Sequence, residues 1–348
     1  MSESPGNKRH SPDMTGNKDL PKAVYITWAQ TSSRSDSTAL FFNARSFKIT
    51  SFNSRSKILL PWRYLIAAAK TLYVLLREQP KVVFVQNPPT MSVMLVWLYA
   101  RFSGVSFIPD SHCSVFNSRK WRRFLWIYRY IAKQALTNIA HNHRYVEEIK
   151  TWGAHSVNLG SVPRKMQTMQ TYSVRPGFNV MFPCSFQGDE PVAEVIKAAR
   201  SLPDVNFYIT GNFRRAPREL VDGAPSNTIF TGFLSNEEYV ALMKACTAVM
   251  CLTTRGDTNQ SGAYEAIAVN RPIILSDWAL LREIYGKGTA FANNDSASLV
   301  GAVLKIRDNY DFYLEQIALL REETMATWES NYRELRAAIL NGNEICAS

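Results

Sequence analysis

The chain has 348 residues, of which 46% are hydrophobic, and this length and composition suit two folded domains with apolar cores. Its five cysteines form no CxxC pair, which argues against a disulfide framework and a thiolate zinc site and favours a reducing compartment. The net charge of +11 is uneven, because residues 1–175 hold 25 Lys and Arg but 8 Asp and Glu, whereas residues 176–348 hold 15 and 21. The basic half is expected to face an anionic partner, which charge alone leaves open among nucleic acid, a membrane and a phosphorylated substrate.

The first 22 residues are polar and rich in Gly, Pro and Ser, and they lack the apolar core of a secretory signal. We expect a disordered leader over residues 1–22, with the folded chain beginning near Ala23. The longest uncharged apolar run, residues 91–100, is shorter than the ~20 residues that cross a bilayer. No transmembrane helix is therefore predicted.

Short β-branched or aromatic runs alternate with helical stretches in both halves, a pattern that predicts parallel sheets with crossover helices. The strands expected in the first half are 24–26, 47–50, 82–85 and 105–108, with helices at 62–77 and 118–133. The strands expected in the second half are 179–182, 206–210, 228–230, 249–252 and 273–275, with helices at 191–201, 236–245 and 263–268.

The predicted fold is α/β, with two Rossmann-like doubly wound domains that face a cleft. The N-terminal domain is expected over residues 23–165 and the C-terminal domain over residues 177–308. A helical tail over residues 309–340 is expected to pack back on the N-terminal domain. Because ligands of open α/β sheets lie beyond the carboxyl ends of the strands, the loops that follow strands are the candidate sites.

The loop after the expected strand 249–252 is the first such site. Ser261 and Gly262 begin the helix that follows, where free backbone N–H groups and the positive helix end favour a phosphate. Asp257 and Glu265 supply carboxylates that can accept hydrogen bonds from sugar and ribose hydroxyls. In the simpler alternative, Asp257 is a solvated loop acid and Glu265 only complements the helix dipole.

This segment resembles the signature of the group 1, or family 4, glycosyltransferases: an acid, seven residues, a glutamate and then a Gly-x-Pro turn. The resemblance implies a GT-B fold, a ribose contact for Glu265 and a donor-sugar contact for Asp257. Asp257 stands where the family usually has Glu. Asn270 replaces the family's Gly, a change that is tolerated because Asn also reaches left-handed conformations.

The loop 184–191, CSFQGDEP, lacks the Arg and Lys with which many members of that family hold the pyrophosphate. Together with the segment LPDVNFYITGN, it is similar to a subgroup of bacterial polysaccharide-type transferases. Phosphate contacts are therefore expected from Ser185, from backbone amides, or from Arg214 and Arg215.

The loop after the expected strand 228–230 carries Gly232 and Phe233, and the resemblance implies that the nucleobase stacks near them. Ser235 is the expected N-cap of the acidic helix start that follows.

Two strands of the first half end in loops that are expected to face the cleft. Gln86 and Asn87 precede a Pro-Pro turn, and Asp110 and His112 follow the next strand. These loops resemble the QNPP and D-x-H motifs of the dolichol-linked beta-mannosyltransferases and their bacterial relatives, whose acceptors are polyprenyl-diphosphate sugars. Gln86 and Asn87 are thus candidate acceptor contacts.

The D-x-H motif is open to several roles. His112 can contact the donor or act as a base, because imidazole titrates near neutral pH, or it can be a structural loop residue. Asp110 can take a proton from the acceptor hydroxyl, orient His112, or simply cap its loop.

The first loop of the chain offers Ser33 and Arg34 as further acceptor contacts. The pair His141 and His143 suggests a metal, but zinc needs three or four ligands and nothing nearby in the sequence completes the set. The chain also has no Asp-x-Asp, P-loop or GxGxxG motif. No metal and no cofactor is therefore predicted, and a UDP- or GDP-sugar is the expected donor substrate.

The stretches 62–77 and 118–133 mix basic residues with Trp, Tyr and Leu, as helices in a bilayer interface do. In the alternative, their apolar faces belong to the domain core. The residues expected to meet an anionic membrane are Arg119, Lys120, Trp121, Arg122, Arg123 and Trp126. Nucleic-acid binding is disfavoured, because the basic cluster lies on a helix beside lipid-like aromatics and no nucleic-acid-binding module is recognisable.

The expected function is that of a hexosyltransferase, peripheral on the cytoplasmic face of a membrane, that moves a hexose from a nucleotide sugar to a lipid-diphosphate-linked saccharide. Catalysis would depend on placing the acceptor hydroxyl and stabilising the departing diphosphate, with Asp110, His112 and Asp257 as the catalytic candidates. The two resemblances differ over retention or inversion, which stays open. A sugar-nucleotide epimerase and a non-catalytic membrane adaptor are the alternatives.

Overall fold

The computed structural model of the chain describes residues 19–29, 33–51, 58–160 and 166–345, with the side chains of residues 33, 34 and 343–345 left out. The chain divides into two compact units. Unit 1 comprises residues 1–162 and 327–348, and unit 2 comprises residues 163–326.

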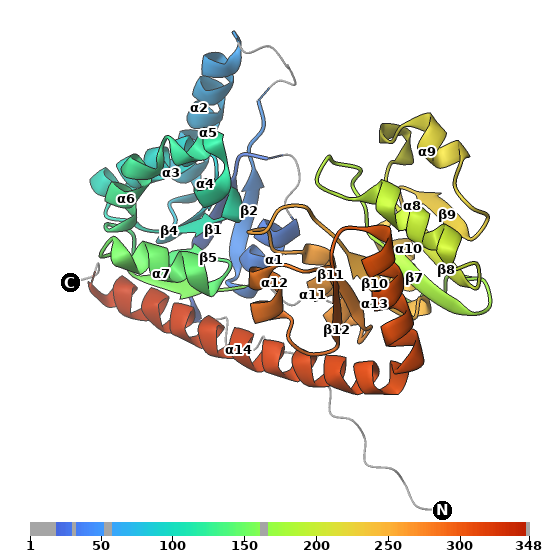
Figure 1. Cartoon of the computed structure of the whole chain (residues 1–348). Helices are drawn as coiled ribbons and strands as arrows, with labels where there is room; N and C mark the ends of the chain where they lie inside the picture. Colours follow the sequence, from blue (N-terminus) through green and yellow to red (C-terminus); the bar gives the residue numbers. More distant parts are fainter. Residues whose placement is uncertain (1–18, 30–32, 52–57, 161–165, 346–348) are drawn as a thin grey trace, which may run out of the picture. The chain divides into compact units, whose positions relative to one another are not determined.

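Within the described residues, unit 1 contains one six-stranded parallel sheet in the order β2-β1-β3-β4-β5-β6 (Figure 1). Its strands are β1 (Ala23–Thr27), β2 (Ala44–Lys48), β3 (Val82–Asn87), β4 (Ser106–Ser111), β5 (Asn138–Ala140) and β6 (Ser156–Asn158). Its helices are α1 (Ser33–Phe41), α2 (Leu60–Glu78), α3 (Thr90–Ser103), α4 (Cys113–Asn117), α5 (Arg119–Arg122), α6 (Leu125–Ala132) and α7 (His143–Thr151).

Unit 2 repeats this plan, and its described residues form a six-stranded parallel sheet in the order β12-β11-β10-β7-β8-β9. Its strands are β7 (Phe178–Phe182), β8 (Val205–Thr210), β9 (Thr228–Gly232), β10 (Ala248–Cys251), β11 (Ile273–Ser276) and β12 (Thr289–Ala292). Its helices are α8 (Val192–Ser201), the 3-10 helix η2 (Phe213–Arg215), α9 (Arg218–Asp222), α10 (Asn236–Ala245), α11 (Ser261–Ala268), α12 (Ala279–Ile284) and α13 (Ser296–Asp308).

Both sheets are built around apolar central strands. Every residue of β1 and β10 is buried, as expected where helices cover both faces of a parallel sheet. In unit 1, Tyr25 and Phe84 stack with their ring centroids 5.8 Å apart. The last helix, α14 (Tyr310–Ile345), begins in unit 2, and its later residues Trp328 and Leu335 pack into the core of unit 1.

The strand order reverses at one point in each sheet, between β1 and β3 in unit 1 and between β7 and β10 in unit 2. The connections on the two sides of such a point run over opposite faces, which leaves a crevice at the carboxyl ends of the two strands. In unit 2 the loops after β7 and β10 meet there, and these are the loops 183–191 and 252–260.

Three local predictions are wrong. The second strand lies at Ala44–Lys48 rather than at 47–50, and α1 begins inside the expected first loop, at Ser33. The expected helix 118–133 is two short helices, α5 and α6. Helix α6 packs Tyr128 into the core of unit 1, whereas α5 has no buried residue. The two segments therefore differ in their packing and do not form one straight helix.

Two turn predictions are confirmed. Asn270 adopts a left-handed conformation with φ 58°, as its place in the turn before β11 requires. Ser235 caps α10 in a full capping box, because its hydroxyl accepts from the Glu238 N–H while the Glu238 carboxylate accepts from the Ser235 N–H.

Candidate functional site

The beginning of α11 is packed unusually close to the sheet of unit 2. A Cβ added at Gly262 would lie 2.8 Å from Cys251 Sγ and 3.6 Å from Pro183 Cγ, so only glycine allows this approach. The N-cap residue, Gln260, makes no side-chain cap. The start of α11 therefore has no side-chain cap from its N-cap residue, and a helix start of this kind can bind an anion.

Glu265 is the fixed carboxylate of this region. It is buried in the second turn of α11, and its Oε2 accepts a 2.7 Å hydrogen bond from the Tyr239 hydroxyl. Asp257 is exposed in the preceding loop. Burial raises the pKa of the neighbouring Cys251 thiol, and the charge of Glu265 adds to this effect, so Cys251 stays a neutral thiol rather than a nucleophile.

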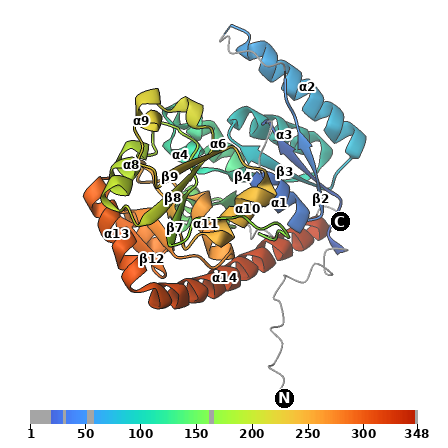
Figure 2. The same ribbon diagram turned by 90° about the vertical axis from the view of Figure 1, so that its right-hand side faces the viewer.

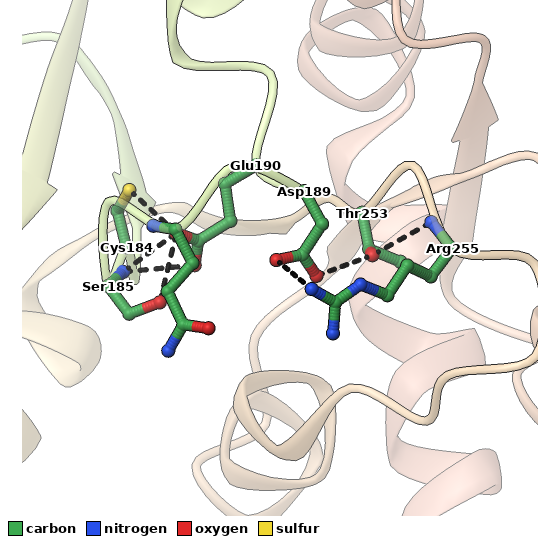
Figure 3. A network of polar contacts seen from close by, with 7 residues as sticks. Cys184, Ser185, Asp189, Glu190, Thr253 and Arg255 are labelled. Carbon is green, nitrogen blue, oxygen red and sulfur yellow. Dashed lines mark hydrogen bonds and ion pairs between the residues drawn. The ribbon is translucent and has the colours of Figure 1, made fainter. Parts of the chain in front are cut away.

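The loop after β7 is closed by Glu190 (Figure 3). Its carboxylate accepts hydrogen bonds from the N–H of Ser185 at 2.9 Å, the N–H of Gln187 at 2.9 Å and the hydroxyl of Ser185 at 3.0 Å. Ser185, predicted to bind phosphate, thus binds a carboxylate in this structure.

Asp189 joins this loop to the one after β10 (Figure 3). One carboxylate oxygen accepts from the Thr253 hydroxyl at 3.2 Å, and the other lies 3.2 Å from Arg255 Nη2. The Asp189 carbonyl also accepts from the Thr254 N–H at 2.8 Å. Asp189, Glu190 and Arg255 were not predicted as site residues, although the sequence carries all three within the two candidate loops.

The remaining candidates of unit 2 follow β8 and β9. Arg214 is exposed in η2, and the guanidinium of Arg215 donates to the Ser185 carbonyl at 3.4 Å. Gly232 ends β9 with φ 75°, and the side chain of Phe233 is 90% exposed. Phe233 is thus accessible for stacking, and Arg215 lies nearer to the loop after β7 than its sequence position suggests.

In unit 1, Asp110 is fully buried and holds two other polar groups. The Tyr25 hydroxyl donates to its Oδ2 at 2.6 Å, and His141 Nε2 lies 3.0 Å from its Oδ1. The ring centroids of His112 and His141 are 4.6 Å apart. A buried carboxylate in this position can fix the orientation of an imidazole, so the group is suited to proton transfer.

His141 is the member of this group that was not predicted to act with Asp110. The neighbouring strands β4 and β5 bring the two together, since Asp110 pairs with Ile139 and Ser111 with Ala140. One ligand atom each from Asp110, His112 and His141 lie within 4.8 Å of one another, a geometry that could also hold a metal ion. His143, the other histidine of the expected pair, is not in this set.

The loop after β3 is tied to the same region. The His112 N–H donates to the Asn87 carbonyl at 2.8 Å, and Gln86 Oε1 accepts from the Ser35 hydroxyl at 3.1 Å. Asn87 is buried, its Oδ1 accepts from the Thr90 hydroxyl at 3.3 Å, and the peptide bonds before both following prolines are cis. The predicted contacts Ser33 and Arg34 have side chains outside the described residues.

The predicted membrane residues are at the surface of unit 1. Arg119, Lys120, Arg122, Arg123 and Trp126 are exposed, while Trp121 is partly covered, with Lys120 Nζ 4.5 Å from its ring centroid. No helix in the described part of the chain is long and apolar enough to span a bilayer.

Helix α2 presents a larger apolar surface than that segment. Its buried side includes Ala67, Thr71 and Leu75, and its opposite side exposes Trp62 and Leu65 to 61% and 59%. The exposed apolar stripe of α2 consists of Trp62, Leu65, Leu72, Tyr73 and Leu76. Figure 2 shows the N-terminal end of α2 extending beyond the other helices of unit 1.

The comparisons with known proteins agree with this architecture. Residues 188–309 match the family model of Glycosyl transferases group 1. No curated protein sequence matches the chain at a significant level.

Several solved structures share the fold of the whole chain. Sucrose-phosphate synthase from Thermosynechococcus elongatus is 12% identical with a TM-score of 0.67, over 94% of this chain and 89% of that one. Anabaena Alr3699/HepE in complex with UDP-glucose is 12% identical with a TM-score of 0.67, over 91% of this chain and 100% of that one. A structure described as a UDP-N-acetylglucosamine 2-epimerase from Listeria monocytogenes is 10% identical with a TM-score of 0.59, over 90% and 97%.

Likeness at these identities establishes the fold, and the family match lies on the unit that carries Glu190, Arg255 and Glu265. Residues 188–309 therefore match the group 1 glycosyltransferases, and the chain as a whole has the GT-B fold.

Proposed function

We propose that the protein is a glycosyltransferase that moves a hexose from a nucleotide-diphosphate sugar to a lipid-diphosphate-linked saccharide. The observation that carries the proposal is the close approach of α11 to the sheet at Gly262, with Glu265 buried behind it, inside the segment that matches the family. An anion-binding helix end and a fixed hydroxyl acceptor are the two features that a nucleoside diphosphate needs.

The donor would bind to unit 2 in parts. Its diphosphate would take the N–H groups of Ser261 and Gly262, and its ribose hydroxyls would donate to Glu265. Asp257 would contact the sugar, and Phe233 would stack on the nucleobase. The HepE structure contains UDP-glucose, which supports a nucleotide sugar as the donor class.

The acceptor would bind to unit 1, with Gln86 and Asn87 among its contacts. The acceptor hydroxyl would give its proton to the imidazole pair His112 and His141, which Asp110 orients. The oxygen would then bond to the anomeric carbon while the bond to the diphosphate breaks. Helix-end amides of α11 would stabilise the charge of the departing nucleoside diphosphate.

A lipid-linked acceptor is supported by the surface of unit 1. The exposed apolar stripe of α2 would enter the acyl boundary of a membrane, and the basic residues of α5 would face anionic headgroups. Arg63, Lys70 and Arg77 give α2 the basic residues that accompany such a stripe.

The proposal is tested by incubating the purified protein with membranes and a panel of radiolabelled sugar nucleotides. We expect transfer of label to lipid extracts, and we expect Glu265→Ala to reduce transfer at least tenfold, because a charged acceptor for hydroxyls contributes ~1.5–3 kcal/mol. Glu237→Ala, on the exposed first turn of α10, is the matched control. Lipid-linked label that persists in Glu265→Ala would refute the donor site.

A sugar-nucleotide epimerase is the second candidate, because the Listeria structure shares the fold. An epimerase would convert the donor with no acceptor present. Turnover of sugar nucleotide by the protein alone, without membranes, would favour it over the transferase.

A further inference from the structure

Two consecutive carboxylates lie where the strand order of unit 2 reverses, and each is held by groups of a kind that also binds phosphate. Glu190 accepts from two backbone N–H groups and one hydroxyl in the loop after β7. Successive N–H groups of this kind form a concave site for an anion. The site is therefore a ready anion site that the chain fills with its own side chain (Figure 3).

Asp189 pairs in a similar way with a cationic side chain. Its Oδ1 lies 3.2 Å from Arg255 Nη2, and the Arg255 side chain is 62% exposed. Guanidinium groups bind carboxylate and phosphate in the same geometry. Arg255 is thus a cation of the kind that binds phosphate, and in this structure it is paired with Asp189.

We propose that Asp189 and Glu190 are internal substitutes for the diphosphate of the donor, and that the donor binds by displacing Glu190 from the amides and Asp189 from Arg255. This inference rests on the proposed function, since it concerns the diphosphate of the same donor. The two residues would then act as determinants of donor affinity and not as phosphate ligands.

The backbone at the floor of the anion site is closely packed, so the displacement is proposed for the side chains of the two acids. Gly211 has φ 96°, and a Cβ there would lie 1.9 Å from the Cys184 carbonyl oxygen, so the turn after β8 is locked against the start of the loop. A Cβ added at Gly188, next to the two acids, meets nothing within 4 Å. Ser185 is exposed and Glu190 only partly covered, so a phosphate can reach the site when Glu190 turns outward.

Charge explains why displacement is needed. A diphosphate cannot share the amides with a carboxylate, because two anions at hydrogen-bonding distance of the same donors repel strongly. The apparent affinity for the donor is then the intrinsic affinity multiplied by the fraction of molecules in which the site is open. Removing the carboxylate removes that reduction.

The test measures binding of inorganic pyrophosphate and of UDP by calorimetry, without divalent cations, to the full-length protein and its variants. We expect Glu190→Gln to bind pyrophosphate about tenfold more tightly, which corresponds to about 1.4 kcal/mol. Glu190→Asp keeps the charge but shortens the reach by one methylene, so it should bind more tightly than the wild type and less tightly than Glu190→Gln. Glu237→Gln should behave as the wild type.

Arg255 supplies the second arm of the test. Asp189→Asn should also tighten pyrophosphate binding, and adding Arg255→Ala to it should remove that gain. Unchanged or weaker binding in Glu190→Gln and Glu190→Asp would overturn the proposal and leave Glu190 as a loop-stabilising residue. If Glu190→Gln does not fold, Glu190→Asp and Asp189→Asn decide by the same comparison.

Pyrophosphate separates this inference from the proposed function, because it has no nucleoside. If the protein does not use nucleotide sugars, UDP will bind no better than pyrophosphate and Glu265→Ala will change neither, while the comparison between wild type and Glu190→Gln still decides. Wild-type protein that binds pyrophosphate only with Mg²⁺, and loses this binding in Glu190→Gln, would show that the acids hold a cation and would also overturn the proposal.

Discussion

Gly262 determines how closely α11 approaches the sheet, and its replacement tests that packing. In Gly262→Ala the added methyl would lie 2.8 Å from the sulfur of the buried Cys251. Overpacking of this kind costs about 1–3 kcal/mol. We expect urea denaturation to show a loss of that size in the free energy of unfolding.

The matched control for this prediction is Gly301→Ala in α13, where an added Cβ meets nothing within 4 Å. That change should stabilise the protein by about 0.5–1 kcal/mol, because alanine favours a helix over glycine. Adding Cys251→Ala to Gly262→Ala should recover part of the loss, since it removes the sulfur that the methyl meets. Equal stability of Gly262→Ala and the wild type would contradict the packing.

Asp110 is the second residue whose contacts make a clear prediction. Asp110→Asn keeps the shape but loses the charge that faces Tyr25 and His141, so we expect transferase activity to fall about a hundredfold or more. Tyr25→Phe removes one hydrogen bond and should lower stability by about 1 kcal/mol with a smaller effect on activity. Equal losses of activity in the two variants would argue that Asp110 has only a structural role.

The sequence places together those candidate residues that follow one another closely in one loop. Ser261, Gly262 and Glu265 could be found because a strand, a loop and a helix in succession define where the helix begins. The contact between Asp110 and His141 depends on the pairing of β4 with β5, and no sequence spacing encodes that register. For the same reason, the pairing of Asp189 with Arg255 across two loops was not visible.

At the scale of elements, the strands with a clear apolar run were predicted, including the four-residue β10 and β11, whereas β5, β6 and β12 were missed. Strands β5 and β6 have three residues each, too few for a period of two to be visible, and only two of the four residues of β12 are buried. Strand β2 lies at an edge of its sheet and has exposed residues, so the sequence pattern predicts the strand too late, over the more apolar residues 47–50. Helix α1 begins in a serine-rich segment that indicates a loop.

Helix α2 is the element that makes a prediction about the membrane. Replacing Leu65 and Leu76 by Ser removes two leucines from its exposed apolar stripe, and each leucine contributes about 1.5–3 kcal/mol when fully buried. We expect the double variant to bind lipid vesicles at least tenfold more weakly in a flotation assay. Its thermal stability should be unchanged, because both side chains are exposed.

The control for this experiment is Phe312→Ser, which removes an exposed aromatic residue from the unit 2 part of α14. It should leave flotation unchanged. Vesicle binding that survives loss of the two leucines would exclude α2 from the interface and leave α5 and α6 as the candidate contact.

At the scale of the whole molecule, charge is divided along the chain. Residues 1–175 carry an excess of 17 positive charges, whereas residues 176–348 carry an excess of six negative ones. Most of the first segment belongs to unit 1, which also carries α2 and α5. Unit 1 holds 24 Lys and Arg but 11 Asp and Glu, whereas unit 2 holds 16 and 18. An anionic surface would thus attract unit 1, which presents the apolar stripe, more strongly than unit 2, which is proposed to bind the nucleotide sugar.

Membrane binding is then expected to depend on electrostatic attraction and on burial of the apolar stripe, and the two contributions respond differently to salt. Attraction to vesicles that contain an anionic lipid should weaken as NaCl rises, because the Debye length falls from about 10 Å at 0.1 M to about 3 Å at 1 M. Each basic residue near such a surface contributes about 1 kcal/mol, so neutralising Arg119, Lys120, Arg122 and Arg123 should reduce both the affinity and its dependence on salt. Binding to uncharged vesicles should be weaker, insensitive to salt and dependent on the α2 stripe.

If the variant with all four basic residues neutralised floats as well as the wild type at every salt concentration, the basic residues of α5 and its C-cap lie away from the lipid.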